Sequence, residues 1–394
     1  MSSTNNEWKE YKFSDFVDIN PTVIMKGEVE YSFIEMKDLQ DGVKYCFPSA
    51  KRKLSGGARF TEGDTLFARI TPCLENGKIC MVKGLENGVG FGSTEFLVFR
   101  GKENISDNDF VFYLSRWDEV RGFAESNFEG TSGRQRVPKN CFDNLHLDLP
   151  LISEQRAIAS VLSSLDDKID LLHRQNKTLE ALAETLFRQW FVEEADESWE
   201  VGNLDDEFDF TMGQSPEGSS LNEDKVGMIF YQGRTDFGFR FPNPRVYTTA
   251  VTRMSKKFDT LVSVRAPVGD MNMALEECCL GRGVAAFRFK HNNDYYSYTY
   301  YKMRSLMAQI KQYEDSGTVF GSIGKDDFKK LKNIIPPNNL IEEFQKKVKP
   351  IDDKIFLNTI QIRTLTQLRD TLLPKLMSGE VRVNIVGKNP EGME

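Results

Sequence analysis

The longest regular pattern of apolar residues in this chain steps by four and three positions. Its members are Ile158, Leu162, Leu165, Ile169, Leu172, Asn176, Leu179, Ala183, Leu186 and Trp190. Such steps give a seven-residue repeat, and an apolar seam with that period is typical of a coiled coil. The pattern therefore predicts a long helical segment over residues 151–195. A helix from about Leu151 to Val192, at 1.5 Å per residue, would be a rod of roughly 60 Å.

The same stretch recurs near the end of the chain. The tetrapeptide DDKI at residues 166–169 returns at residues 352–355, and GDTLFARITP at residues 63–72 is echoed by FDTLVSVRAP at residues 258–267. A repeat this long is not a solenoid, whose units run to about 20 to 50 residues. We therefore predict a tandem duplication of one globular unit followed by one long helix, with the second helix over residues 339–380.

Each helical seam contains one asparagine, Asn176 in the first and Asn358 in the second. A buried amide without a partner is costly, so the two are expected to meet and bond to each other. Asn176 falls at an a position and Asn358 at a d position, and antiparallel coiled coils pair a with d. This register, which also sets Leu165 against Arg369, predicts antiparallel helices within one chain. The alternative is that both asparagines lie at frayed or solvent-facing positions.

The second helical segment contains two prolines. Pro350 lies well inside it and would remove a backbone hydrogen bond there. We therefore expect this helix to bend at Pro350 or to start as two pieces. Pro374 and Gly379 are expected to close it.

Outside the helical segments the pattern is that of short strands. Alternating apolar runs such as GKICMVKG and GVAAFRFK are broken by Gly, Pro and Asn, and a helical stretch follows near the end of each unit. The predicted fold is α+β: two pseudo-symmetric mixed α/β domains, separated by two long helices packed as an intramolecular antiparallel coiled coil. We expect the domains at 1–150 and 196–338, the helices at 151–195 and 339–380, and a tail at 381–394.

Composition places the chain among globular proteins, with 40% hydrophobic and 28% charged residues over 394 positions. No segment approaches the roughly 18 apolar residues that a membrane span needs, and the first residues, MSSTNNEWKE, do not resemble a signal peptide. We expect a cytoplasmic protein with no membrane partner. Six cysteines without a C-x-x-C pair and only three histidines disfavour a zinc site and indicate unpaired, mostly buried thiols.

The net charge of −8 looks unsuited to nucleic acid, but the charge is unevenly distributed. Residues 151–200 carry 5 Lys or Arg against 11 Asp or Glu, whereas residues 225–265 carry 8 against 2. Residues 51–69 carry 5 against 2, and residues 130–140 carry 3 against none. Local basic faces of this kind suffice for phosphate contact on an acidic protein. The alternative is that they are ordinary solvated faces.

The candidates for DNA contact are loops that combine cations with amides and hydroxyls, because these groups bind phosphates and read base edges. In the first domain they are Lys51, Arg52, Lys53, Arg59, Arg69, Ser132, Arg134, Gln135, Arg136 and Lys139; in the second they are Gln232, Arg234, Arg240, Arg245, Arg253, Lys256, Lys257, Arg265, Ser322 and Lys325. Each could instead be a structural or solvent-facing residue. Arg69 and Arg265, in matching contexts, could be packed beside a strand.

The sequence contains no recognisable catalytic motif. GTVFGSIGKDD misses the first glycine and the hydroxyl of a phosphate-binding loop, and there is no G-x-S-x-G, H-E-x-x-H or dinucleotide-binding pattern. The two carboxylates of DDKI point apart on a helix, which makes a poor metal pair and indicates a polar face or a subunit contact. The chain is predicted to bind rather than to catalyse.

Taken together, these features resemble the specificity subunit of type I restriction-modification enzymes over nearly the whole chain. The resemblance rests on PLISEQRAIASVLSSLDDKIDLL from Pro150, on TLFRQWF, and on a second copy that ends in IDDKI and LLPKLMSGEV. Pro150, Glu154, Gln155, Arg156 and Ile158 match the family pattern. The second copy reads PPNNLIEEFQKKV, without the Glu-Gln pair, which puts the contacts of that pair in doubt there.

The resemblance implies that each domain is a target recognition domain that reads one half of a split sequence in double-stranded DNA. The helices would be conserved spacers that fix the gap and dock two methylation subunits. Those partners would carry S-adenosylmethionine, and separate restriction and translocase subunits would use ATP and Mg²⁺. This chain would be non-catalytic, without a metal or cofactor of its own.

Two other interpretations compete with this one. A coiled-coil scaffold or adaptor would not show salt-sensitive binding to duplex DNA. A methyltransferase in its own right would need an N/D-P-P-Y/F loop, which the sequence lacks.

Overall fold

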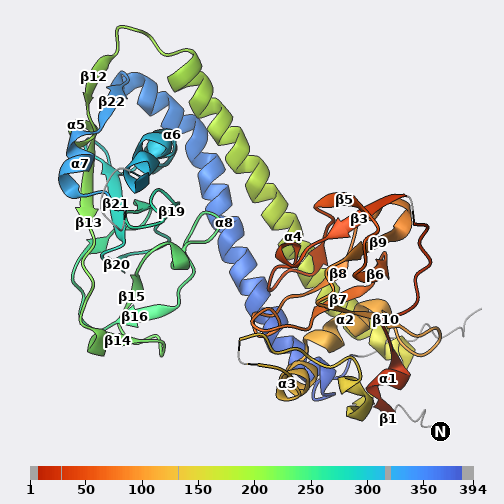
Figure 1. Ribbon diagram of the computed structural model, residues 1–394. Coiled ribbons are helices and arrows are strands. Elements are labelled where there is room, and N and C mark those ends of the chain that lie inside the picture. Colours follow the sequence, from red (N-terminus) through yellow and green to blue (C-terminus); the bar gives the residue numbers. More distant parts are fainter. Residues whose placement is uncertain (1–7, 28, 132, 316–320, 384–394) are drawn as a thin grey trace, which may run out of the picture. The chain divides into compact units, whose positions relative to one another are not determined.

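The computed structural model describes residues 8–27, 29–131, 133–315 and 321–383. The chain folds into two compact units. Unit 1 consists of Met1–Leu172 and Gln361–Glu394, and unit 2 consists of His173–Ile360. Each unit therefore contains one globular part and a portion of both long helices (Figure 1).

The globular part of unit 1 is built on three sheets. The largest has the strand order β2 (Val17–Ile19), β10 (Phe96–Gly101), β7 (Thr65–Ala68), β8 (Ile79–Val82), β4 (Tyr45–Cys46). The second has the order β5 (Ala50–Lys53), β3 (Glu30–Ile34), β9 (Val89–Gly92), β6 (Ala58–Thr61), and β1 (Lys9–Lys12) pairs with β11 (His146–Leu149). The helices are α1 (Phe13–Phe16), α2 (Asn108–Arg116) and α3 (Asp118–Ser126). One core joins Phe13, Phe67 and Phe110 of this part to Ile158 and Leu376 of the long helices.

Unit 2 is organised in the same way. One sheet has the order β13 (Phe208–Met212), β21 (Val284–Phe289), β18 (Thr260–Ser263), β19 (Met271–Met273). The next has the order β14 (Leu221–Asn222), β16 (Val246–Thr248), β15 (Met228–Tyr231), β20 (Cys278–Leu280), β17 (Met254–Ser255), and β12 (Glu200–Asn203) pairs with β22 (Lys332–Ile335). The helices are α5 (Leu204–Glu207), α6 (Tyr296–Asp315) and α7 (Lys325–Lys330). Its core joins Phe208 and Tyr298 to Phe187 and Phe344 of the long helices.

The two globular parts repeat one topology, which confirms the internal duplication. The order β2-β10-β7-β8 corresponds to β13-β21-β18-β19, and the first strand of each unit pairs antiparallel with the strand before a long helix. The repeated GDTL and FDTL sequences act alike. Asp64 and Asp259 each accept a backbone N–H of their own turn, and they form ion pairs with Arg100 and Arg288.

The long helices are α4 (Ile152–Arg188), which continues into a π-helical turn at Gln189–Glu193, and α8 (Asn338–Met377). In unit 2, Nδ2 of Asn358 donates to Oδ1 of Asn176 over 2.9 Å, and both side chains are buried. In unit 1, Nη1 of Arg369 donates to Asp166, the neighbour of its predicted partner Leu165, over 2.7 Å. From Asp166 to Asn176 along α4, the bonded residue on α8 changes from Arg369 back to Asn358, so the helices are antiparallel. The predicted asparagine pair is confirmed.

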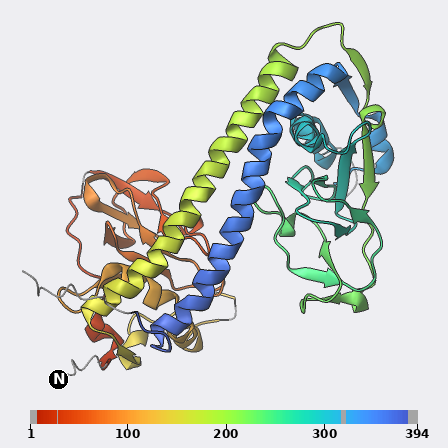
Figure 2. The same cartoon turned by 180° about the vertical axis from the view of Figure 1, so that it is seen from behind.

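Pro350 does not divide the second helix, because α8 is continuous from Asn338 to Met377. Of the two predicted outcomes, a start as two pieces is wrong, whereas a bend agrees with the ribbon of α8, which changes direction within its N-terminal part in both views (Figures 1 and 2). Pro374 also lies inside α8. Only Gly379 follows the end of the helix, where its φ of +74° takes the left-handed conformation that glycine favours.

In unit 1 the DDKI tetrapeptide fixes the globular part to α4. The phenol of Tyr113, on α2, donates to Asp166 over 2.7 Å, and the phenol of Tyr45 donates to Asp167 over 3.2 Å. Asp166 is buried, so the predicted polar face or subunit contact is wrong for this carboxylate. Burial together with the charge of Asp166 raises the pKa of Tyr113, which keeps the phenol protonated as the donor.

In unit 2 the second DDKI, which lies on α8, makes the equivalent contacts to the globular part. Tyr301, on α6, donates to Asp352 over 3.2 Å, and Tyr296 donates to Asp353. Asp352 is buried like its counterpart in unit 1. The tetrapeptide therefore recurs because each copy anchors one globular part to one helix.

A glutamine near the start of each long helix makes a second such connection. In unit 1, Gln155 accepts the backbone N–H of Asp107 over 2.9 Å and donates to two backbone carbonyls. The second copy has no glutamine at the matching position. Gln345, one turn further along α8, accepts the N–H of Tyr298 over 3.1 Å and donates to a carbonyl. A different residue thus makes the contact that the sequence left in doubt.

Candidate nucleic-acid interface

In unit 1 the structure brings Arg59 and Lys139, which are distant in sequence, to one surface hollow. The residues that line it are Asn20, Pro21, Thr22, Val23, Gly57, Ala58, Arg59, Thr94, Phe96 and Lys139. The lining contains two cations, two hydroxyls and an amide, and no carboxylate. Groups of this kind bind phosphate oxygens and base edges.

The predicted loop GTSGRQR is held beside Arg69 by backbone contacts. Gln135 accepts the N–H of Thr71 and donates its own N–H to the hydroxyl of Thr71, each over 3.0 Å. Val137 donates its N–H to the carbonyl of Arg69 over 2.8 Å. Arg134 in this loop is exposed, whereas Gln135 and Arg69 are half-buried. Ser132 lies outside the described residues.

Arg136 is exposed but engaged within unit 1. Its guanidinium binds the carboxylate of Glu95 through Nε and Nη2 at 2.8 to 2.9 Å, and this hydrogen bonding raises the pKa of Arg136. A DNA contact by Arg136 would compete with that ion pair. Among the cations of this loop, Arg134 and Lys139 are better placed to meet a phosphate.

The basic run at Lys51, Arg52 and Lys53 lies on β5, an edge strand of its sheet. Lys51 pairs with Glu86 over 2.6 Å, and the Arg52 guanidinium lies 4.1 Å from the centre of the Phe33 ring. Charges on an edge strand also prevent pairing with another chain. This run therefore has a structural explanation beside the predicted one.

In unit 2 the structure joins Arg265 to Ser322 through an antiparallel backbone bridge. Both are exposed, as is Lys325 at the first position of α7. Unit 1 has a matching bridge between Ile70 and Arg136. The two units therefore place a predicted loop at the same strand end.

A second group in unit 2 comes from the YQGRTDFGFRFPNPR stretch. Gln232, Arg234 and Arg245 are exposed. Arg234 pairs with Asp270 over 2.8 Å and Arg245 pairs with Asp236 over 3.2 Å. These ion pairs fix the loop while the guanidinium groups stay at the surface.

Arg253, Lys256 and Lys257 are also exposed, around β17. The ammonium of Lys257 lies 4.3 Å from the centre of the Phe356 ring on α8. That contact gives Lys257 a packing role beside the helix, whereas Arg253 and Lys256 face solvent.

Arg240 does not belong to the interface. It is 1% exposed, and its guanidinium binds Asp352 over 2.6 Å and Glu180 over 3.3 Å, with the Tyr300 ring centre 3.3 Å away. Burial opposes its charge, but the charges of Asp352, the neighbouring tyrosines and Glu180 together outweigh that effect and raise the pKa of Arg240. The DNA-contact prediction for Arg240 is therefore wrong: this arginine ties the globular part of unit 2 to both helices. Sequence alone gave no sign of its burial, because Arg240 lies in a loop stretch whose other arginines, Arg234 and Arg245, are exposed.

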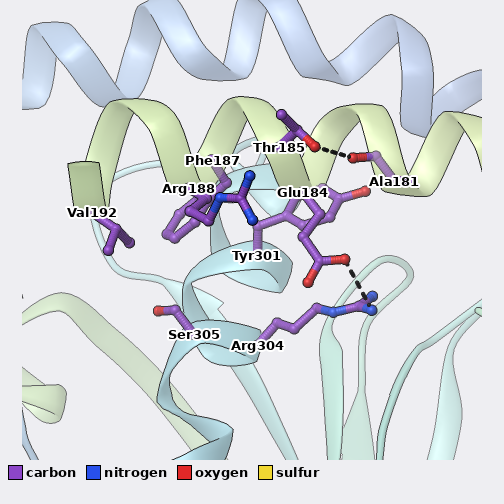
Figure 3. A pocket seen from close by; sticks show the side chains of 9 residues that line it. All are labelled: Ala181, Glu184, Thr185, Phe187, Arg188, Val192, Tyr301, Arg304 and Ser305. Carbon is purple, nitrogen blue, oxygen red and sulfur yellow. Dashed lines mark hydrogen bonds and ion pairs between the residues drawn. The ribbon is translucent and has the colours of Figure 1, made fainter. Parts of the chain in front are cut away.

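A further hollow of unit 2 lies where α4 faces α6 (Figure 3). Its lining includes Phe187, Val192 and Tyr301, with Arg304 paired to Glu184 over 3.2 Å. Within the described ranges, no cluster of His, Cys, Asp or Glu could hold a metal ion. No helix in those ranges is both long enough and apolar enough to cross a membrane.

Comparisons with known proteins find type I restriction enzyme specificity subunits that are similar to most of this chain. The putative type I restriction enzyme MjaX specificity subunit of Methanocaldococcus jannaschii is 29% identical over 341 residues, which cover 82% of this chain and 80% of the relative. The type I restriction enzyme HindI specificity subunit of Haemophilus influenzae is 25% identical, with 95% of this chain and 100% of the relative covered.

The chain is also similar to a solved structure and matches a family model. The type I restriction-modification system S subunit from M. genitalium has a TM-score of 0.56 at 18% identity, covering 96% of this chain and 98% of that one, and so has a similar fold. The family model described as Type I restriction modification DNA specificity domain matches residues 5–181 and 196–367. These two matches span most of the chain, which therefore belongs to the family of type I restriction modification DNA specificity domains and contains two copies of the domain.

Proposed function

We propose that this chain is the DNA-reading subunit of a type I restriction-modification complex. The observation that carries the proposal is the duplication: two units of one topology each present exposed cations at the same strand end. Two such surfaces on one chain suit a target made of two separate half-sites, one for each unit.

The long helices would set the number of unread base pairs between the half-sites. Both α4 and α8 pass from one unit into the other, so the units are joined twice. The buried Asn176–Asn358 pair supports one fixed register, because sliding either helix would leave a buried amide without its partner.

The same helices would dock two methylation subunits. Leu171 and Leu368 in unit 1, and Leu182 and Leu357 in unit 2, are exposed although they lie on α4 and α8. Exposed apolar side chains on a helix surface suit contact with another protein. The hollow of Figure 3, lined by Phe187, Val192 and Tyr301 among others, is a second candidate contact in unit 2.

The chemistry would belong to the partners. Methylation subunits would bring S-adenosylmethionine, and restriction and translocase subunits would use ATP and Mg²⁺, while this chain contributes recognition without a metal, cofactor or catalytic group of its own. Because its substrate would be chromosomal or invading duplex DNA, it would act in the cytoplasm.

Co-expression with cognate methylation subunits, followed by sequencing of methylated sites, tests the proposal. The expected result is one bipartite motif with a fixed gap. Replacing the globular part of unit 2 by that of another family member should change one half-site and leave the other intact. Methylation without any sequence preference would contradict the proposal.

A second experiment addresses the helices. Inserting seven residues after Leu172 in α4 and seven before Gln361 in α8 keeps the heptad phase and lengthens the pair by about 10 Å. At about 3.4 Å per base pair, the gap should grow by about three base pairs with both half-sites unchanged. A changed half-site with an unchanged gap would count against a spacer role.

A further inference from the structure

The most exposed large apolar side chain of the described ranges belongs to Ile24. It is 90% exposed, whereas the next, Val201, is 66% exposed. An isoleucine left in water forgoes the stabilisation that burial of its apolar surface would provide. Ile24 is therefore a candidate for contact with an apolar partner surface.

The chain around Ile24 is held in place on both sides. Asn20 bonds to the backbone of Val98 through both its own N–H and its side chain, over 2.7 and 3.1 Å. Val23 is buried. The Lys26 N–H donates to the phenol of Tyr31 over 2.7 Å. These contacts hold residues 20–26 in place, with Ile24 exposed among them.

The surroundings of this loop favour DNA over a protein partner. Residues 20–23 form one wall of the hollow that contains Arg59 and Lys139, and Arg59 also donates to the carbonyl of Val23 over 3.5 Å. The hollow has cations and no carboxylate in its lining. An apolar tip beside unopposed cations matches a duplex, whose phosphates flank stacked, apolar bases.

We propose that Ile24 is a wedge that inserts at a base step of the half-site read by unit 1, while Arg59 and Lys139 bind the adjacent phosphates. Apolar side chains inserted between base pairs unstack the step and kink the duplex. Pyrimidine–purine steps deform most easily, so the wedge would favour such a step at its position. This inference rests on the proposed DNA-reading function.

The test uses the full chain bound to its methylation subunits and a duplex that carries its methylated target. 2-Aminopurine replaces each base of the unit 1 half-site in turn, because its fluorescence rises when stacking is lost. The variants are Ile24→Ala, Ile24→Met as the conservative replacement, and Val29→Ala as a control. Val29 is an apolar residue of the same loop and is 50% exposed.

The fluorescence of 2-aminopurine at one base step should rise when the wild type, Ile24→Met or Val29→Ala binds. Ile24→Ala should lose that signal and bind the target about tenfold or more weakly, because the contacts that offset the cost of unstacking are lost. The salt dependence of DNA binding by Ile24→Ala should match that of the wild type, because no charge is removed. Ile24→Ala should also assemble with the methylation subunits as the wild type does.

Three results would overturn the wedge while leaving the proposed function intact. The first is unchanged fluorescence and affinity in Ile24→Ala. The second is weaker binding by Ile24→Ala when no step brightens even with the wild type, which would indicate a groove contact such as a thymine methyl. The third is failed assembly of Ile24→Ala with the methylation subunits, which would indicate a protein contact. Absence of sequence-specific binding by the wild-type complex would overturn both proposals.

Discussion

Asn358 donates a hydrogen bond to Asn176 over 2.9 Å between α8 and α4, and the two side chains are 0% and 1% exposed. Amides at such positions lower the stability of a coiled coil but specify its register. The pair therefore accounts for how two helices with similar apolar seams select one alignment in unit 2.

Replacing one member of this pair should cost more than replacing both. Asn358→Leu leaves the amide of Asn176 buried without its partner, so the free energy of unfolding should fall by about 1 to 3 kcal/mol. Asn176→Leu with Asn358→Leu should recover most of that loss, because two apolar groups pack without an unmet hydrogen bond. Chemical unfolding of the three variants measures this, and equal losses in the single and double variants would contradict it.

Substitutions of Arg240 and Arg253 should distinguish a buried structural arginine from a surface one by their effects on the free energy of unfolding. Arg240→Met leaves Asp352 and Glu180 without their buried partner and should lower the free energy of unfolding by about 3 to 5 kcal/mol. Arg253→Ala removes an exposed side chain and should change it by at most about 0.5 kcal/mol. Thermal unfolding followed by circular dichroism compares the two. If Arg240→Met unfolds at the same temperature as the wild type, this arginine does not anchor unit 2.

Two tyrosine-to-phenylalanine variants test the anchors of unit 1. Tyr113→Phe removes a buried donor from the carboxylate of Asp166 and should cost about 1.5 to 3 kcal/mol of unfolding free energy. Tyr45→Phe removes a more exposed bond to Asp167 and should cost under about 1 kcal/mol. Both variants keep the ring, so packing is matched. Equal costs would show that burial of Asp166 is not what makes the first bond strong.

The cations of the unit 1 hollow should appear in the salt dependence of DNA binding. Each phosphate contact contributes about 0.9 to the slope of log affinity against log salt. Arg59→Ala with Lys139→Ala should therefore reduce the slope by about 1.8 in the assembled complex. Lys346→Ala, which removes a surface lysine paired with Glu342 on α8, serves as the control and should leave the slope unchanged. An unaltered slope in the double variant would remove these residues from the interface.

Glu207 should give unit 2 a pH-dependent stability. Burial raises the pKa of its carboxyl, which accepts hydrogen bonds from Tyr298 and Asn333. The folded state then favours the protonated form, so stability is greatest below the unfolded pKa of about 4.3 and falls as the pH rises through the folded pKa. Glu207→Gln should remove this fall.

Thermal midpoints measured from pH 4 upward provide the test. The midpoint of Glu207→Gln relative to the wild type should rise as the pH rises, whereas Asp209→Asn, at an exposed position of β13, should show no such trend. The amide introduced at position 207 can also donate to Oδ1 of Asn333, which is buried and has no hydrogen-bond partner among the described residues. A relative midpoint that is constant or falls with pH would contradict the direction of the pKa shift.

The sequence by itself determined the duplication, the two long helices and their antiparallel register. The duplication shows in the two distant copies of DDKI. The helices follow from short-range periodicity: a seven-residue apolar repeat marks a coiled-coil seam, and one asparagine in each seam favours one alignment. The repeated DDKI tetrapeptide marked one structurally important position on each long helix. Its role as an anchor was missed, because the tyrosines that bind it are distant in sequence.

Only the tertiary structure decided which charged residues are at the surface. Arg240 and Arg245 come from one loop, yet the first is buried between two helices and the second is exposed. Likewise, Gln345 replaces a missing glutamine from one turn away, and α8 continues through Pro350. The physical reason is the same in each case. Burial and pairing depend on which elements contact each other in the folded chain, and residue type and local spacing do not determine those contacts.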